Sequence, residues 1–301
     1  MDGVGEGQTK APLDLLADWL AEDMAAVSAL IRERMASRHA PRIPEVTAHL
    51  VEAGGKRLRP MLTLAAARML GYTGSDHVKL AATVEFIHTA TLLHDDVVDE
   101  SHRRRGRPTA NLLWDNKSSV LVGDYLFSRS FQLMVETGNL RVLDILANAS
   151  ATIAEGEVGG VIAGAPESQV RALYAYGDAL GIAFQIVDDI LDYGGQDAVI
   201  GKNTGDDFRE RKLTLPVIKA VAKASPEERL FWLRVIEKGD QQDGDLAEAM
   251  TILARHGAIA AARQESLDWA ERARRALDNL PVHPLRSLLF ELVDFVVDRV
   301  L

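Results

Sequence analysis

Helical periodicity runs through almost the whole chain and leaves little choice of fold class. Between residues 13 and 35, apolar side chains return every three or four positions, which is the spacing of one helix face. Similar helical patterns recur over residues 61–70, 79–99, 118–135, 140–157, 168–193, 213–223, 226–238, 245–280 and 284–301. No segment shows the clear alternation of apolar and polar residues that marks a half-buried strand. The sequence therefore predicts an all-α protein.

The breaks between these helices are too short to separate domains. Pro41 and Pro44 mark one break and Gly71 another, but there is no long linker rich in Pro, Gly or Ser. No repeat of 20–50 residues is visible either. Since 47% of the 301 residues are hydrophobic, the chain can bury a sizeable core. We expect one domain over residues 1–301.

Composition excludes several classes of function. The chain has no Cys, which rules out disulfides, thiolate metal sites and cysteine nucleophiles. A formal net charge of −10 argues against a nucleic-acid binder, which needs a basic surface. The acidic N-terminus does not resemble a signal peptide, and no run of about 18 apolar residues predicts a membrane span. We expect a cytoplasmic protein.

Three carboxylates lie at the end of one apolar helix. Asp95 and Asp99 are four residues apart and share a helix face, with Asp96 beside them. Like charges at this spacing repel, and the helix dipole disfavours them at a C-terminus, so a cation should compensate. Mg²⁺ fits, because it takes one or two carboxylates together with phosphate oxygens. Alone, the motif is equally compatible with a solvated acidic helix end.

The same pattern returns in the helix predicted at residues 168–193. Asp188, Asp189 and Asp192 repeat the spacing, and Gln185 lies on the same side of the helix. One such motif can arise by chance. Two, each embedded in an apolar helix, are better explained as facing carboxylate clusters that hold several Mg²⁺ ions around one diphosphate.

Two basic segments could supply the cations that a diphosphate also needs. Lys56, Arg57 and Arg59 follow a pair of glycines, and four arginines at residues 103–105 and 107 follow the first acidic motif. Arg binds phosphate oxygens bidentately, whereas Lys acts as a point charge. Alone, each segment is more often a solvated loop. Beside two aspartate motifs in an acidic protein, a phosphate site is the better interpretation.

His88 lies two helical turns before Asp95, on the same face, where it could donate to a phosphate, although a lone His on an apolar helix is usually a core residue. With His88 added, the motifs resemble the trans-isoprenyl (polyprenyl) diphosphate synthase family. The resemblance extends from about residue 15 to the C-terminus, in family order. It is carried by residues 55–60, 88, 95–99, 104–106, 108–109, 123–126, 181–192, 201–202 and 212–216.

The resemblance implies a helical bundle of the isoprenoid synthase type around a central active-site cavity. It also implies a Mg²⁺-dependent prenyltransferase that joins isopentenyl diphosphate to an allylic diphosphate, and a homodimer for which the face around residues 118–135 could serve. A lipid product could partition to a membrane.

Roles follow from the resemblance residue by residue. The metal ligands would be Asp95, Asp96, Asp99, Asp188, Asp189 and Asp192. The contacts to the allylic diphosphate would be Arg104, Gln185 and Lys202. The contacts to isopentenyl diphosphate would be Lys56, Arg59, His88 and Arg105, with Arg57 beside them and Lys212 as a further phosphate contact. The residues closest to the chemistry would be Asp95, Asp99, Arg104, Asp188, Asp192 and Lys202.

Product length is also implied by the family pattern. A bulky residue near the fifth position before the first Asp of the motif closes the product tunnel, and here that position is the small Ala90, followed by Thr91. This favours a long-chain synthase, in the octaprenyl to decaprenyl range, of the type that feeds quinone side chains.

The sequence departs from the family at two places. About thirty residues, among them a Lys-Thr pair that contacts the allylic diphosphate, are missing near residues 158 and 159. They could be omitted from the given sequence, deleted, or naturally absent, and natural absence would impair the enzyme. Arg211 stands where the family usually has Gly.

Two other functions stay open. A non-catalytic, regulatory subunit of a prenyl synthase would fit the missing segment, but it would not need two complete aspartate motifs and two basic segments. A terpene cyclase shares the ionisation chemistry. Its second metal motif, however, is typically an Asn/Ser/Glu triad, and it needs no second diphosphate site.

Overall fold

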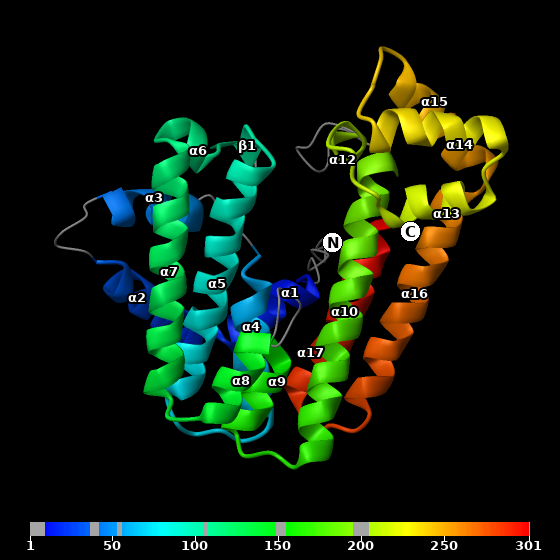
Figure 1. The fold of residues 1–301 in the computed structure, drawn as a ribbon. Helices are drawn as coiled ribbons and strands as arrows, with labels where there is room; N and C mark the ends of the chain where they lie inside the picture. Colours follow the sequence, from blue (N-terminus) through cyan, green and yellow to red (C-terminus); the bar gives the residue numbers. More distant parts are fainter. Residues whose placement is uncertain are drawn as a thin grey trace, which may run out of the picture.

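The computed structural model describes residues 10–36, 42–52, 56–104, 107–148, 155–194 and 205–300. This part of the chain is almost wholly helical, so the all-α prediction is confirmed (Figure 1). The helices are α1 (Pro12–Trp19), α2 (Ala21–Met35), α3 (Arg42–Glu52), α4 (Leu58–Met69), α5 (Asp76–Val98), α6 (Ala110–Leu113), α7 (Asn116–Glu136), α8 (Leu140–Asn148), α9 (Glu155–Ile162), α10 (Glu167–Gly194), α12 (Asp206–Arg209), α13 (Leu215–Lys223), α14 (Pro226–Trp232), the π-helical turn η1 (Leu233–Glu237), α15 (Asp245–Arg255), α16 (Ala258–Leu277), α17 (Pro284–Val297) and the 3₁₀ turn η2 (Asp298–Val300).

A short antiparallel ladder follows α5, in which β1 (Arg103–Arg104) pairs with β2 (Arg107–Pro108). None of the described helices is long and apolar enough to cross a membrane.

Two predicted helices are divided in the structure. The prediction of one helix over residues 245–280 is wrong, because Gly257 takes a φ of 60° in the left-handed region and separates α15 from α16. The segment at 13–35 is divided at Leu20, whose φ of −102° and ψ of 13° are not helical. In both cases the apolar period continues across the break, so periodicity alone could not show it.

Two pairs of long helices position the acidic motifs. α5 packs along α7, and α10 packs along α16. In Figure 1 both α5 and α10 run toward the upper end of the bundle, where β1 follows α5 and α12 follows α10. The C-terminal ends of the two helices that carry the aspartates are therefore at the same end of the molecule.

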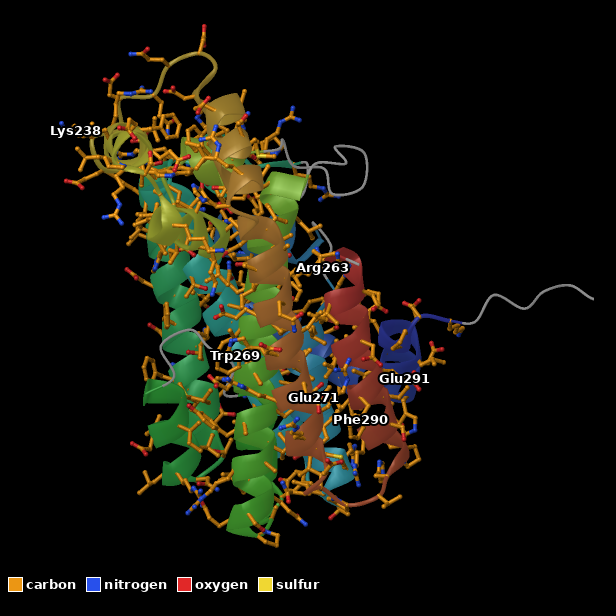
Figure 2. All side chains as sticks on the ribbon, turned by 90° about the vertical axis from the view of Figure 1, so that its right-hand side faces the viewer. Lys238, Arg263, Trp269, Glu271, Phe290 and Glu291 are labelled. Carbon is orange, nitrogen blue, oxygen red and sulfur yellow. The ribbon has the colours of Figure 1, made fainter. Side chains whose placement is uncertain are left out.

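The main core takes side chains from both ends of the chain. Leu16 of α1 and Leu292 of α17 are both buried in it, each contributing about 1.5–3 kcal/mol of hydrophobic stabilisation. The buried Tyr176 of α10 donates its hydroxyl to the Leu289 carbonyl of α17 at 3.1 Å. Figure 2 shows α17 beside α16, with Phe290 and Trp269 on these two helices. These contacts hold α10 in place.

Close helix contacts depend on two glycines. A Cβ atom on Gly123 of α7 would lie 2.3 Å from Nε2 of His94, so the His94 ring could not keep its place between α5 and α7. A Cβ atom on Gly159 of α9 would lie 2.7 Å from the Thr63 carbonyl oxygen of α4. His94 accordingly packs between helices, where it also lies against Phe127.

Candidate active site

The first acidic motif presents two carboxylates outward. Asp95 and Asp99 are exposed in the last turn of α5, and the Asp99 amide donates to the Asp95 carbonyl at 2.8 Å. Partial burial raises the pKa of Asp95, and the negative charge of Asp99 raises it further, while Arg104 opposes them. The two carboxylates therefore repel each other, and a bound cation would relieve that repulsion.

Asp96, the middle residue of this motif, points inward. It is fully buried, and its Oδ1 accepts hydrogen bonds from Nε and Nη2 of Arg104 at 3.0 and 2.8 Å. Its backbone carbonyl accepts from Asn111 at 3.2 Å and from the Ser101 amide at 3.0 Å. Asp96 thus fixes the β1–β2 ladder to the end of α5 and orients Arg104, whose side chain is 30% exposed.

The second acidic motif fastens neighbouring segments to α10. Asp189 accepts from Nε2 of Gln185 at 2.9 Å and from the Leu215 amide at the start of α13 at 3.2 Å. Asp192 is buried and accepts from the Asp207 amide of α12 at 3.0 Å. Asp188, half-exposed, forms an ion pair instead, as described below.

Lys212 lies among carboxylates beside the end of α10. Its Nζ lies 2.5 Å from Glu210 and 3.6 Å from Asp207. Burial lowers the pKa of Lys212, but the charges of Glu210, Asp207 and Asp99 outweigh burial and leave it raised. Asp99 belongs to α5, whereas Lys212 precedes α13 beside the end of α10. The negative charge of Asp99 therefore acts on a lysine that lies beside the end of α10.

The first basic segment lies at the start of α4. Nη1 of Arg59 is 3.3 Å from Nε2 of His88 on α5, so two residues predicted to bind the same diphosphate are in contact. Lys56 is exposed, with Nζ 4.6 Å above the Phe295 ring. Arg57 takes a left-handed φ of 46° and donates to Ser28 of α2 at 2.7 Å, so it braces the segment.

The other predicted residues differ in how far the structure describes them. Arg105 and Lys202 lie outside the described residues. Ala90 is fully buried in the core, and Thr91 uses its hydroxyl to donate to the His88 carbonyl at 2.8 Å. Phe86, one helical turn before Ala90 on the same face, is buried as well.

Arg299 is a site residue that the sequence analysis did not identify. Its Nη1 lies 3.1 Å from Oδ1 of Asp188, and its guanidinium carbon lies 5.4 Å from the centre of the Phe184 ring. It stands in η2, more than one hundred residues after the motif that it contacts. No local pattern marks it, because only the fold brings the C-terminal turn to α10.

The donor set fits a divalent cation that arrives with phosphate. Within the described residues, no three His, Asp or Glu side chains are gathered closely enough to hold an ion by themselves. Mg²⁺ does not require such a cage, because it keeps several waters and takes one or two carboxylates with substrate phosphate oxygens. The exposed Asp95 and Asp99 offer such ligands.

Comparison with known proteins decides the family. The model of the polyprenyl synthetase family matches residues 40–160 and 157–253. The chain belongs to this family. Octaprenyl diphosphate synthase of Escherichia coli K12 is 39% identical, over 95% of this chain and 99% of that protein. The all-trans-nonaprenyl-diphosphate synthase (geranyl-diphosphate specific) of Rhodobacter capsulatus is 38% identical, over 95% and 98%.

Solved structures similar to this chain belong to the same family. The crystal structure of a decaprenyl diphosphate synthase from Rhodobacter capsulatus is 67% identical, with a TM-score of 0.92 over 96% of this chain and 100% of that one. A polyprenyl synthase from Caulobacter crescentus CB15, complexed with calcium and isoprenyl diphosphate, is 43% identical, with a TM-score of 0.88 over 97% and 99%. The predicted family, isoprenoid synthase fold and prenyltransferase class are confirmed, and long-chain synthases are prominent among the relatives.

The alignments also bear on the segment near residues 158 and 159. The two ranges matched by the family model meet at residues 157–160. The alignment with the Escherichia coli protein spans 323 positions but takes in 95% of 301 residues, or about 286. About 37 positions of that alignment therefore face a gap in this chain.

Proposed function

We propose that this protein is a Mg²⁺-dependent long-chain polyprenyl diphosphate synthase, which adds isopentenyl diphosphate to an allylic diphosphate. The observation that carries the proposal is the position of the two acidic motifs, which stand at the C-terminal ends of α5 and α10 at the same end of the bundle (Figure 1). Relatives named octaprenyl and nonaprenyl synthases support the substrate class.

The basic residues of the chain would bind and orient the two diphosphate substrates. Arg59, with His88 beside it, and Lys56 would bind isopentenyl diphosphate. Arg104, held by the buried Asp96, would bind the allylic diphosphate, for which a guanidinium offers two donors in a fixed geometry. Asp96 thereby acts on the substrate through Arg104.

Mg²⁺ would be held by Asp95 and Asp99, the outward carboxylates of the first motif, and by Asp188, Asp189 and Asp192 of the second, and it would supply neutralisation of the diphosphate charge. The allylic carbon–oxygen bond breaks, and its electron pair leaves with the diphosphate, whose charge Arg104 helps to stabilise. The isopentenyl double bond attacks the allylic carbon, and the departed diphosphate takes the proton that is then lost. No side-chain nucleophile is required.

Product length is proposed to lie in the octaprenyl to decaprenyl range, for quinone side chains. The fully buried, small side chain of Ala90 supports this, because a bulky group there would occupy the space below the first motif. A cytoplasmic location stays a prediction.

A homodimer is proposed through the outer face of α7. Leu121, Phe131 and Val135 are 66%, 48% and 65% exposed and lie on one side of this helix. Leu112 and Leu113 of α6, which precedes α7, are also exposed. Apolar side chains gathered in this way mark a protein interface more often than open surface.

We further propose that the given chain lacks about thirty residues of the family near residues 158 and 159. The two matched ranges and the alignment gap support this, and α9 runs as one helix from Glu155 to Ile162 across the join. The same observation is what favours the second candidate, a non-catalytic subunit of a prenyl synthase.

An elongation assay tests the proposal. Purified protein of confirmed intact mass receives Mg²⁺, isopentenyl diphosphate and geranyl, farnesyl or geranylgeranyl diphosphate, and products are separated by chain length. Long polyprenyl products that disappear with a chelator are expected. Absence of product from a folded protein of confirmed intact mass, in the presence of Mg²⁺ and both substrates, would favour the non-catalytic subunit.

A further inference from the structure

The C-terminal turn η2 places a cation on a residue proposed as a metal ligand. Nη1 of Arg299 lies 3.1 Å from Oδ1 of Asp188, and the two side chains are only 25% and 37% exposed. The guanidinium also lies over Phe184, one helical turn before Asp188 on α10. Two separate contacts therefore hold this side chain against the second acidic motif.

The turn itself has an apolar anchor. Val300 packs against the buried cluster that contains Ile186 and Ile190, on the same helix as Asp188. The turn η2 is thus held to α10 by the partly buried Val300, whereas the Arg299 side chain is held by an ion pair and a cation–π contact. The guanidinium can leave Asp188 without removing the turn from α10.

Lys56 adds a second positive charge near Asp188, besides that of Arg299. The pKa of Lys56 is lowered, first by the partial burial of this mostly exposed side chain and then by the charge of Arg299, while Asp188 opposes the shift. Lys56 and Arg299, which are far apart in the sequence, thus both interact with the charge of Asp188. A divalent ion on that carboxylate would add a third positive centre beside them.

We infer that Arg299 is an internal counter-ion of the second acidic motif, which holds Asp188 while no divalent cation is bound and gives it up when one binds. The inference rests on the proposed function for the role of Asp188. Mg²⁺ sits about 2.0–2.1 Å from its ligand oxygens and brings two positive charges, so on the Asp188 carboxylate it would repel the Arg299 guanidinium and weaken the ion pair. Metal occupancy and the Arg299 contact are therefore coupled, and each weakens the other equally.

Binding of Mn²⁺ alone tests the coupling without turnover, through loss of the free-ion EPR signal. Mn²⁺ suits the same oxygen ligands as Mg²⁺. Arg299→Gln should bind the ion about two- to fivefold more tightly than wild type, since a partly exposed ion pair no longer competes. Arg299→Lys, which keeps the charge, should show a smaller change. Arg275→Gln on α16, whose side chain is 74% exposed, is the matched control and should bind as wild type.

Thermal unfolding gives a second readout that a merely structural ion pair would not produce. In EDTA, Arg299→Gln should melt below wild type, because it has lost the contact with Asp188. At saturating Mg²⁺ the difference should vanish, because the pair is then broken in both proteins. A difference that stays the same in EDTA and Mg²⁺ would overturn the inference.

The two proposals fail in different ways. Equal Mn²⁺ affinity in wild type and Arg299→Gln, with elongation intact, would overturn the counter-ion role and leave the synthase. Absence of Mn²⁺ binding in every variant, together with absence of elongation, would overturn both.

Discussion

Replacement of Asp96 by Ala is expected to destabilise the fold and to weaken binding of the allylic diphosphate. Asp96 is fully buried, and one of its oxygens accepts from two nitrogens of Arg104 at 3.0 and 2.8 Å. Removing one partner of a buried ion pair costs about 3–5 kcal/mol. Because Arg104 is 30% exposed and can regain water, about 3 kcal/mol is the expected cost.

The measurement combines unfolding with kinetics. A loss of about 3 kcal/mol lowers the melting temperature by roughly 5 °C in a protein of 301 residues. The KM for the allylic diphosphate should rise about tenfold, since a hydrogen bond to a charged group contributes about 1.5–3 kcal/mol. The exposed Asp99→Asn is the matched control, and it should lose elongation activity while its stability changes by less than about 0.5 kcal/mol.

A double-mutant cycle separates the pair from other effects of the truncation. Asp96→Ala and Arg104→Ala should each destabilise, and the double variant should cost clearly less than their sum. Additive effects, or an Asp99→Asn variant as unstable as Asp96→Ala, would refute the division of the motif into one inward and two outward carboxylates.

Three further outcomes are expected. Ala90→Phe should shorten the product, read by chromatography, at a cost of about 1–3 kcal/mol because the site is fully buried; unchanged product length would contradict the tunnel assignment. His77 is buried, with its Nε2 3.1 Å from Oδ1 of Asp23, and burial lowers its pKa from 6.5. The free energy of unfolding should therefore fall as the pH drops below 6.5, where the unfolded chain binds the proton more readily. His77→Gln should flatten this part of a pH–stability curve, and an unchanged curve would exclude His77 as its source. Arg211 has a φ of 60°, so Arg211→Gly should be more stable in urea unfolding than Arg211→Ala by about 1 kcal/mol, and equal stabilities would show that the backbone there is unstrained.

Local patterns were sufficient for much of the fold and for the family. The apolar period predicted α5, α7 and α10 to within a few residues, because each helix buries one face in the core. The spacing of Asp95 and Asp99 indicated a shared helix face, which the structure shows at the end of α5. These features depend on residues a few positions apart, and sequence displays such relations directly.

Contacts between segments far apart in the sequence could not be predicted from local patterns. Nothing in the motif distinguishes Asp96 from its neighbours, and only its packing beneath Arg104 makes it an internal anchor. Asp189 likewise accepts from the Leu215 amide because α13 begins beside α10. Arg299 was missed for the same reason, since its partner Asp188 stands on another helix. The break at Gly257 was missed because the apolar period continues through it.

We propose that the carboxylates at the ends of α5 and α10 act together on a metal-bound diphosphate in chain elongation. The most direct measurement is elongation from isopentenyl and farnesyl diphosphate by purified protein of verified intact mass, with and without Mg²⁺. We expect octaprenyl to decaprenyl products that require Mg²⁺ and are lost in both Asp99→Asn and Asp188→Asn. Products that form in a chelator, or that persist when either carboxylate is neutralised, would contradict it.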